Sequence, residues 1–198
     1  MSLETAVRPV TIIDDIEIIK ILADPIRREI LRQLSERPMT EAQLADRLKF
    51  AKSSVGHHLY TLINAGLIRV ERTEVESHGI QQKYYESTSK LFLENFENVP
   101  PELQRYFLNI HMERLRGILS VIQLMEEKRG RNIEVTREQL EGLSLEIAKQ
   151  IPIVGKQYEK KELDTNRETL LLKIYGESLR KVIAEHHGTP LDAFRSIL

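Results

Sequence analysis

The chain has 198 residues, enough for one medium domain or two small ones, and 41% of them are hydrophobic, which is typical of a globular protein. It contains no cysteine, so disulfides, thiolate nucleophiles and cysteine-ligated metal sites are excluded. The formal net charge of −1 leaves any affinity for nucleic acid to local clusters of basic residues, and the lack of a secretory signal or of an apolar run of roughly 18 residues predicts a soluble, cytoplasmic protein with no membrane contact.

The first segments lead into a domain that we expect to span residues 14–90. Residues 1–13 show no helical period and are interpreted as an N-terminal arm. A short, unusually apolar helix is predicted over 14–23. Asp24 then suits an N-cap and the proline after it suits a first helical position, which predicts a second helix over 25–36.

Residues 40–66 have the pattern of two short helices joined by a tight turn. Thr40 and Gln43 form a capping-box pattern, which predicts that the first helix begins there. The second helix is expected over 52–64, and Gly66 can take the left-handed conformation that ends it. Its inward stripe consists of Val55, Leu59, Leu62 and Ile63.

The opposite side of this second helix carries small or hydrogen-bonding residues that step by three or four and therefore line up in a row. They are Ser53, Gly56, His57, Tyr60 and Asn64. Hydroxyl, imidazole, phenol and amide groups can read base edges when a helix lies in the major groove of DNA. A merely solvated face would more usually carry Glu and Lys, so we expect this row to contact DNA.

After Gly66 the hydrophobic period changes from 3.6 residues to two. Residues 67–75 alternate as a strand does, residues 77–79 form a turn, and residues 81–86 are predicted to be the returning strand of a hairpin. Three helices followed by such a hairpin is the order of a winged helix-turn-helix, in which the hairpin is the wing. The predicted fold class is therefore mainly α with a small β-hairpin wing.

The segments LADPIRREILRQL (22–34) and LADRLKFAKSSVGHHLYTLINAGLI (44–68) resemble the winged-helix core of the arsenical-resistance repressor (ArsR) family of prokaryotic and archaeal regulators. The resemblance extends from residue 14 to about residue 87 and implies a DNA-binding transcriptional regulator. It also places His58 in the domain interior. The cysteine pair of the family's metal-sensing members is absent, because residues 43–46 are QLAD, so metal sensing through thiolates is not implied.

The positions that the resemblance assigns to DNA binding fall on the second helix and on the wing. Together with the row described above, the candidate DNA-binding residues are Lys52, Ser53, Ser54, Gly56, His57, Tyr60, Asn64, Arg72 and Lys83. The resemblance implies that Arg72 and Lys83 contact phosphates from the wing, while the helix faces the bases.

Residues 91–198 are predicted to form a helical dimerisation domain that could also hold a small-molecule effector. A long periodic segment covers 102–129, and two further helices begin with capping patterns at Thr136 and Thr165. The first of these two is expected to end at 152–155. The long segment carries an apolar stripe of Leu103, Phe107, Ile110, Leu115, Ile118, Ile122 and Met125. A helix of this length needs a partner, which we expect to be a second copy of the chain.

Other chemistries find little support in the sequence. Histidines occur at His78, His111, His186 and His187, but adjacent histidines on a helix point about 100° apart and cannot chelate one ion together. No phosphate loop, nucleophile motif or convincing carboxylate pair is present. We therefore predict no metal site, no cofactor and no enzymatic activity.

The sequence as a whole predicts a regulator that binds double-stranded DNA sequence-specifically. It is expected to act as a homodimer on an inverted-repeat operator, because two reading helices must reach successive major grooves. The alternative is a winged helix that docks onto other proteins and has no DNA sequence specificity.

Overall fold

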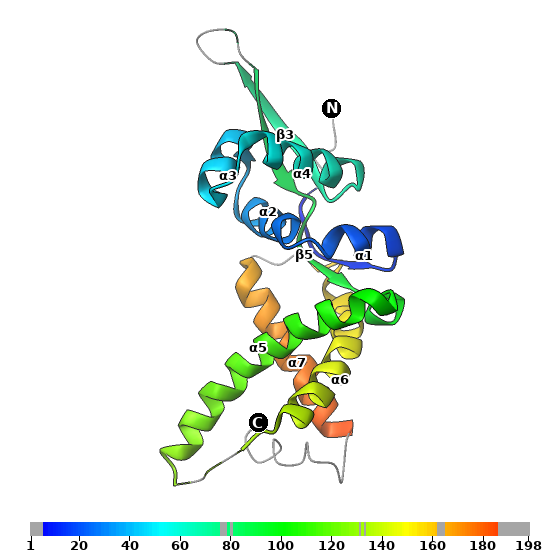
Figure 1. Cartoon of the computed structure of the whole chain (residues 1–198), viewed down its shortest axis with the longest axis vertical. Helices are drawn as coiled ribbons and strands as arrows, with labels where there is room; N and C mark the ends of the chain where they lie inside the picture. Colours follow the sequence, from blue (N-terminus) through cyan, green and yellow to red (C-terminus); the bar gives the residue numbers. More distant parts are fainter. Residues whose placement is uncertain are drawn as a thin grey trace.

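The structure, a computed structural model, describes residues 6–75, 79, 81–130, 132, 134–161 and 165–185. Shorter helices and a projecting hairpin form one end of the molecule, and three longer helices form the other end (Figure 1). The elements are β1 (Arg8–Ile13), α1 (Ile16–Leu22), α2 (Pro25–Glu36), β2 (Met39–Thr40), α3 (Glu41–Leu48), α4 (Lys52–Asn64), β3 (Ile68–Val75), β4 (Gln81–Ser87), β5 (Ser89–Glu94), the 3-10 helix η1 (Phe96–Asn98), α5 (Pro101–Glu127), α6 (Arg137–Gly155), the 3-10 helix η2 (Lys156–Tyr158) and α7 (Arg167–Glu185). Within these described ranges, no helix is both long and apolar enough to cross a membrane.

Helices α1 to α4 and the sheet of β2, β4 and β3 form the winged helix-turn-helix that the sequence predicts. β4 pairs antiparallel with β2 on one side and with β3 on the other, and the hairpin of β3 and β4 projects as the wing (Figure 1). Local capping sets the helix boundaries. The Asp24 carboxylate accepts from the amides of Ile26 and Arg27 at the start of α2, and Thr40 and Gln43 form the predicted capping box of α3. The predicted fold class is confirmed.

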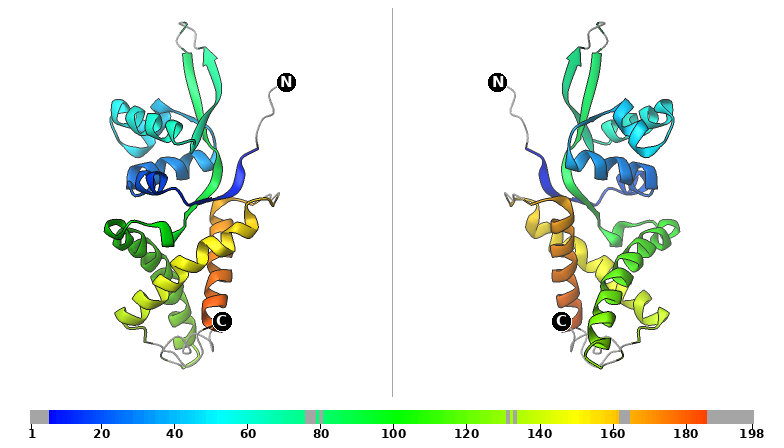
Figure 2. Two further views of the ribbon diagram at one scale, coloured as in Figure 1. Left: turned by 90° about the vertical axis from the view of Figure 1, so that its right-hand side faces the viewer. Right: turned by 90° about the vertical axis from the view of Figure 1, so that its left-hand side faces the viewer.

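Strands β1 and β5 form a separate, parallel two-stranded sheet that lies between the winged helix and the long helices (Figure 2). Val10 pairs with Leu91 in its register. The expectation of an arm over 1–13 and of helix from residue 91 onward is therefore wrong for these two segments. Both strands are short, their inner residues pack on both sides, and each needs a partner far along the chain, so no alternating pattern marks them.

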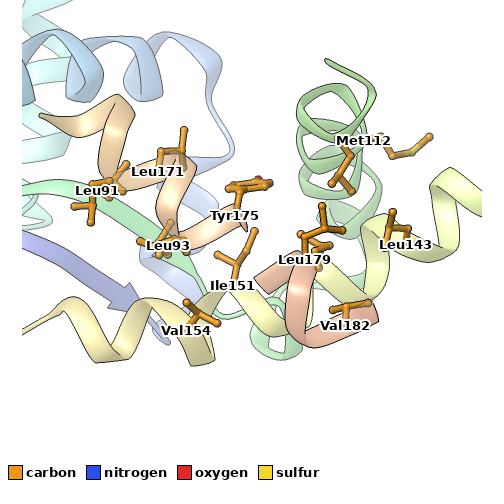
Figure 3. Packing of buried hydrophobic residues seen from close by; sticks show 14 of the residues in the cluster. Leu91, Leu93, Met112, Leu143, Ile151, Val154, Leu171, Tyr175, Leu179 and Val182 are labelled. Atoms are coloured by element: carbon orange, nitrogen blue, oxygen red, sulfur yellow. The ribbon is translucent and has the colours of Figure 1, made fainter. Parts of the chain in front are cut away.

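Helices α5, α6 and α7 pack around a core that also receives side chains from the junction sheet. Figure 3 shows Leu91 and Leu93 of β5 beside Ile151 and Val154 of α6 and Tyr175 of α7. The rest of this core comes largely from the facing sides of the three helices. The winged-helix core extends to the long helices, where Phe107 of α5, fully buried, and Ala148 of α6 pack among the residues of that domain. The two regions are therefore joined by a sheet and by shared packing.

Three details of the long helices can be compared with the expectations. α6 ends at Gly155, within the expected range of 152–155, and it runs through Pro152 because only its last turn follows the proline and the loss of one backbone hydrogen bond is tolerated there. At the start of α7, the Thr169 amide donates to Oδ1 of Asn166 at 2.8 Å, so Asn166 is the capping residue in place of Thr165. On α5, Phe107 and Leu115 of the predicted stripe are buried in the chain's own cores, so this part of the stripe does not need a second copy as its partner, whereas Met125 is 53% exposed. The segment 186–198 lies outside the described residues.

Candidate nucleic-acid interface

A residue in the left-handed backbone conformation makes the turn between the two helices of the motif. Lys49 follows α3 with φ of 59°, a conformation that non-glycine residues seldom adopt, and its amide donates to the carbonyl of Ala45. The turn directs α4 so that the buried side chains of Val55, Leu59 and Leu62 enter the winged-helix core. Ile63 was predicted to join them but is 37% exposed, because it lies about 100° further around the helix than Leu62.

The polar side of α4 is open to solvent, as a surface that reads DNA requires. Lys52, Ser53 and His57 are exposed along one side, and Tyr60 and Asn64 continue the exposed surface toward the end of the helix. Tyr60 is 67% exposed, which is unusual for so large a ring without a covering partner. The structure thus brings these five predicted residues to one helix surface.

Gly56 is half-buried and lies where α3 approaches α4 closely. A Cβ atom built on Gly56 would lie 3.0 Å from Oε1 of Glu41, in the first turn of α3. The glycine therefore makes room for the Glu41 side chain, and it also contributes no side chain of its own to the exposed row. Ser54, a further predicted residue, is half-buried as well.

His58 points into the domain interior, where the resemblance implies it should lie. Its Nδ1 atom is 3.8 Å from Oδ2 of Asp24, the N-cap residue of α2, and its residue exposure is 9%. Burial lowers the pKa of His58, while the charge of Asp24 acts in the opposite direction. His58 is consequently a packing residue between α4 and α2, and His57 is the histidine that faces outward.

The two basic residues predicted on the wing lie on opposite faces of the hairpin. Arg72 pairs with Tyr84 in the register, whereas Lys83 pairs with Thr73, and neighbouring residues of a strand point to opposite sides. The Arg72 guanidinium stacks 3.8 Å from the Tyr84 ring centre and also binds Glu71 and Glu74, each at 2.6 Å. Its charge is therefore already partly neutralised within the wing.

Lys83, in contrast, shares a hollow with the start of α4. This hollow of about 220 Å³ is lined by both Lys83 and Lys52, with the Glu41 carboxylate as an opposing charge. Two lysines that face the same groove from helix and wing can neutralise adjacent phosphates when DNA lies across them. The structure thus joins two residues that are separate in the sequence.

The other face of the wing gathers basic residues that the sequence analysis does not single out. Arg37, Arg47 and Lys49 line a hollow of about 580 Å³ together with Arg72, and of the residues described around it only Asp46 is acidic. They come from the end of α2, from α3 and from the turn after it. Their spacing in the chain follows no motif, so only the fold could reveal this group.

A metal centre receives no support from the geometry. Within the part of the chain that the structure describes, no three or more histidine, aspartate or glutamate side chains are placed to hold an ion together. His111, one of the histidines considered from the sequence, is buried and bonded to Tyr175. His78, His186 and His187 lie outside the described residues.

Comparison with known proteins agrees with the motif. Residues 24–70 match the family described as "Bacterial regulatory protein, arsR family", which confirms the resemblance over that range and supports a DNA-binding transcription regulator. No curated protein matches the chain. Among solved structures, the chain is similar to reduced HlyU from Vibrio cholerae N16961, with 22% identity over 44% of this chain and 75% of that one. The TM-score is 0.29, so this likeness does not bear on function. Residues 24–70, from the N-cap of α2 into β3, are a helix-turn-helix domain of the arsR family, and further helices follow it.

Proposed function

We propose that this protein is a sequence-specific transcriptional regulator that binds an inverted-repeat DNA operator as a homodimer. The observation that carries the proposal is the exposed row Ser53, His57, Tyr60 and Asn64, held outward by the buried stripe on the other side of α4. Short polar groups on the outer face of a second motif helix suit contacts to base edges in the major groove. Lys52 and Lys83, which line one hollow, supply phosphate contacts.

The homodimer follows from a geometric requirement and from an exposed apolar surface. Two reading helices reach successive major grooves only when a fixed seam holds them about 34–36 Å apart. The last two turns of α5 offer such a seam, because Val121, Leu124 and Met125 are 58%, 60% and 53% exposed. These residues follow one another at helical spacing, and apolar clusters of this kind on a surface usually mark an interface.

The experiment that tests the proposal selects DNA from a genomic fragment pool with the purified full-length protein and sequences the bound fraction. We expect enrichment of one motif with two-fold symmetry, whose half-sites are centred about one helical turn apart. Light scattering of the same sample should give twice the chain mass. A bound fraction with no enriched motif would instead support the alternative, a protein-docking winged helix. A monomer at micromolar concentration would refute the dimer.

A further inference from the structure

A pocket of about 290 Å³ lies where the winged helix meets the long helices. Its walls come from the end of α1 and from α2 on one side, and from β5, α5 and the start of α7 on the other. It is distinct from the surface proposed to face DNA, because no described residue of α4, β3 or β4 lines it. The pocket is thus bounded by both regions of the molecule.

The charges around this pocket are strongly one-sided. Among the described residues that line it, five are basic, namely Arg28, Arg32, Lys90, Arg114 and Arg167, and Glu29 alone is acidic. So dense a group of cations costs free energy unless anions approach it. The surrounding carboxylates supply part of this compensation, since Arg32 binds Glu29 and Glu36 and Arg167 binds Glu168.

Two arginines of the cluster are not saturated by the protein. Within the described ranges, Arg114 binds the Tyr175 hydroxyl at 2.9 Å and has no carboxylate partner. Nη1 of Arg28 is buried and lies 3.6 Å from Oε2 of Glu94. Among the described residues it has no hydrogen-bond acceptor. Burial also lowers the pKa of Arg167, and the charges of Arg114 and Arg32 act in that direction against Glu168. Like charges therefore converge here without full compensation.

The remaining wall of the pocket is apolar and partly aromatic. Phe92 of β5 and Tyr106 and Ile110 of α5 face it opposite Leu22 and Leu31 of the winged helix. The volume is at the lower end of the range of ligand sites, about 300–1,000 Å³. It therefore suits a small molecule whose apolar part is about one ring, and it excludes a whole nucleotide. A ligand that fits must pair an anionic group with a small apolar body.

We propose that this junction pocket binds a small organic anion, a carboxylate or phosphate attached to an apolar body of about one ring. Its anionic oxygens accept hydrogen bonds from Arg114 and from the arginines beside it, and its ring packs on Phe92 and Tyr106. Planar guanidinium groups match both head groups with paired hydrogen bonds, which is why the carboxylate and the phosphate are chemically equivalent here.

Calorimetric titration of the full chain tests the site without DNA. The probes are phenyl phosphate, with inorganic phosphate and phenol as its separate halves, and phenylacetate, with acetate as its anionic half. We expect one binding event per chain for at least one complete probe, about tenfold tighter than for either half, because charge and apolar burial both contribute. The tighter of the two complete probes identifies the head group. Absence of binding by both complete probes, or equal binding by phenol, overturns the proposal.

Matched variants locate the site. Arg114→Gln should weaken binding of the better probe about tenfold, whereas Arg116→Gln, on the exposed side of the same helix, should leave it unchanged. Arg32→Gln, at the half-exposed pocket edge, is the second test and decides alone if Arg114→Gln does not fold by circular dichroism. Wild-type affinity in both pocket variants overturns the assignment.

A regulatory consequence rests on the function proposed above. Because α2 and the long helices both line the pocket, a bound anion bridges them and changes how the reading helices of a dimer are spaced. A saturating probe should therefore change the affinity for the enriched DNA about fivefold or more, measured by fluorescence anisotropy. If the protein binds the probe but its DNA affinity is unchanged, the regulatory coupling is overturned and the anion site stands. Failure to enrich any DNA overturns the proposed function and leaves the calorimetric result standing.

Discussion

Nε2 of His111 lies 3.5 Å from Oε1 of Glu94, and both side chains are almost fully buried, at 4% and 5% exposure. On the other side of the imidazole, Nδ1 lies 2.6 Å from the Tyr175 hydroxyl, which also accepts from Arg114. Arginine can only donate, so the tyrosine proton is available to Nδ1 and the Nε2 proton faces Glu94. This chain of contacts connects β5, α5 and α7 directly beside the junction pocket.

Glu94 should make the stability of the protein depend on acid pH. Burial raises the pKa of Glu94, but the charge of Arg28 and the contact with His111 outweigh burial and lower it from 4.5 to about 2. A carboxyl with a lowered folded-state pKa stabilises the fold above its ordinary pKa, and this contribution is lost as the pH falls from about 4.5 towards 2. Urea unfolding at a series of pH values measures the loss.

The variant Glu94→Gln separates this contribution from those of other carboxyls. At neutral pH the free energy of unfolding of this variant should be about 3 kcal/mol lower than that of wild type, because Arg28 loses its buried partner. The difference should shrink as the pH falls through the same window. Glu113→Gln, on an exposed ion pair, is the control and should change stability by less than about 1 kcal/mol. A constant difference at all pH values would contradict the role of Glu94.

His57 is expected to make a base contact. Replacing His57 with Ala should weaken operator binding by about 1–3 kcal/mol and relax the sequence preference at one position of each half-site. Competition binding with single-base operator variants measures both effects. Ser120→Ala, exposed on α5, is the control and should bind like wild type. Unchanged affinity and preference in His57→Ala would remove His57 from the reading surface.

The two faces of the wing should contribute unequally. Lys83→Ala is expected to weaken binding equally on all sequences and to lower the slope of log affinity against log salt by about 1, since one phosphate contact is lost. Arg72→Ala should have a smaller effect, because Glu71 and Glu74 already hold that guanidinium. Salt titrations measure the slopes, with Lys173→Ala on α7 as the control. An unaltered slope for Lys83→Ala would exclude it as a phosphate contact.

The exposed end of α5 should form the dimer seam. Leu124→Glu places a charge in the middle of the surface formed with Val121 and Met125, so burial in an interface becomes unfavourable. We expect analytical ultracentrifugation to show a shift from dimer to monomer. Leu172→Glu, on an equally exposed residue of α7, should remain dimeric. A dimer of wild-type affinity in Leu124→Glu would place the seam elsewhere.

Gly155 should tolerate no side chain, because α6 lies directly on the junction sheet there. A Cβ atom would lie 2.5 Å from Cδ1 of Leu93 and 3.1 Å from Cδ1 of Ile12. The added methyl group should cost about 1–3 kcal/mol through overpacking. This cost outweighs the helix propensity of alanine, which favours it over glycine by at most about 1 kcal/mol. Gly155→Ala should therefore lower the free energy of unfolding. Gly142→Ala in the same helix has open space and should raise it, so destabilisation by both would point to backbone effects alone.

Local patterns account for the helix boundaries of the reading motif. The capping box of Thr40, the Asp24 and Pro25 start of α2 and the stripe of α4 are interactions within a few residues, so the sequence carries them directly. The exposed row on α4 follows from the same periodicity. The sequence by itself therefore determined the winged helix-turn-helix, its resemblance to the arsR family and the identity of the helix surface that faces outward.

Only the tertiary structure decided which distant residues meet. The pairing of β1 with β5 joins segments about 80 residues apart, and no local period signals such a contact. The same holds for Lys52 with Lys83 in one groove, and for the five basic residues of the junction pocket. Their side chains lie on separate elements whose approach depends on how the two cores pack, and this packing is a property of the whole chain.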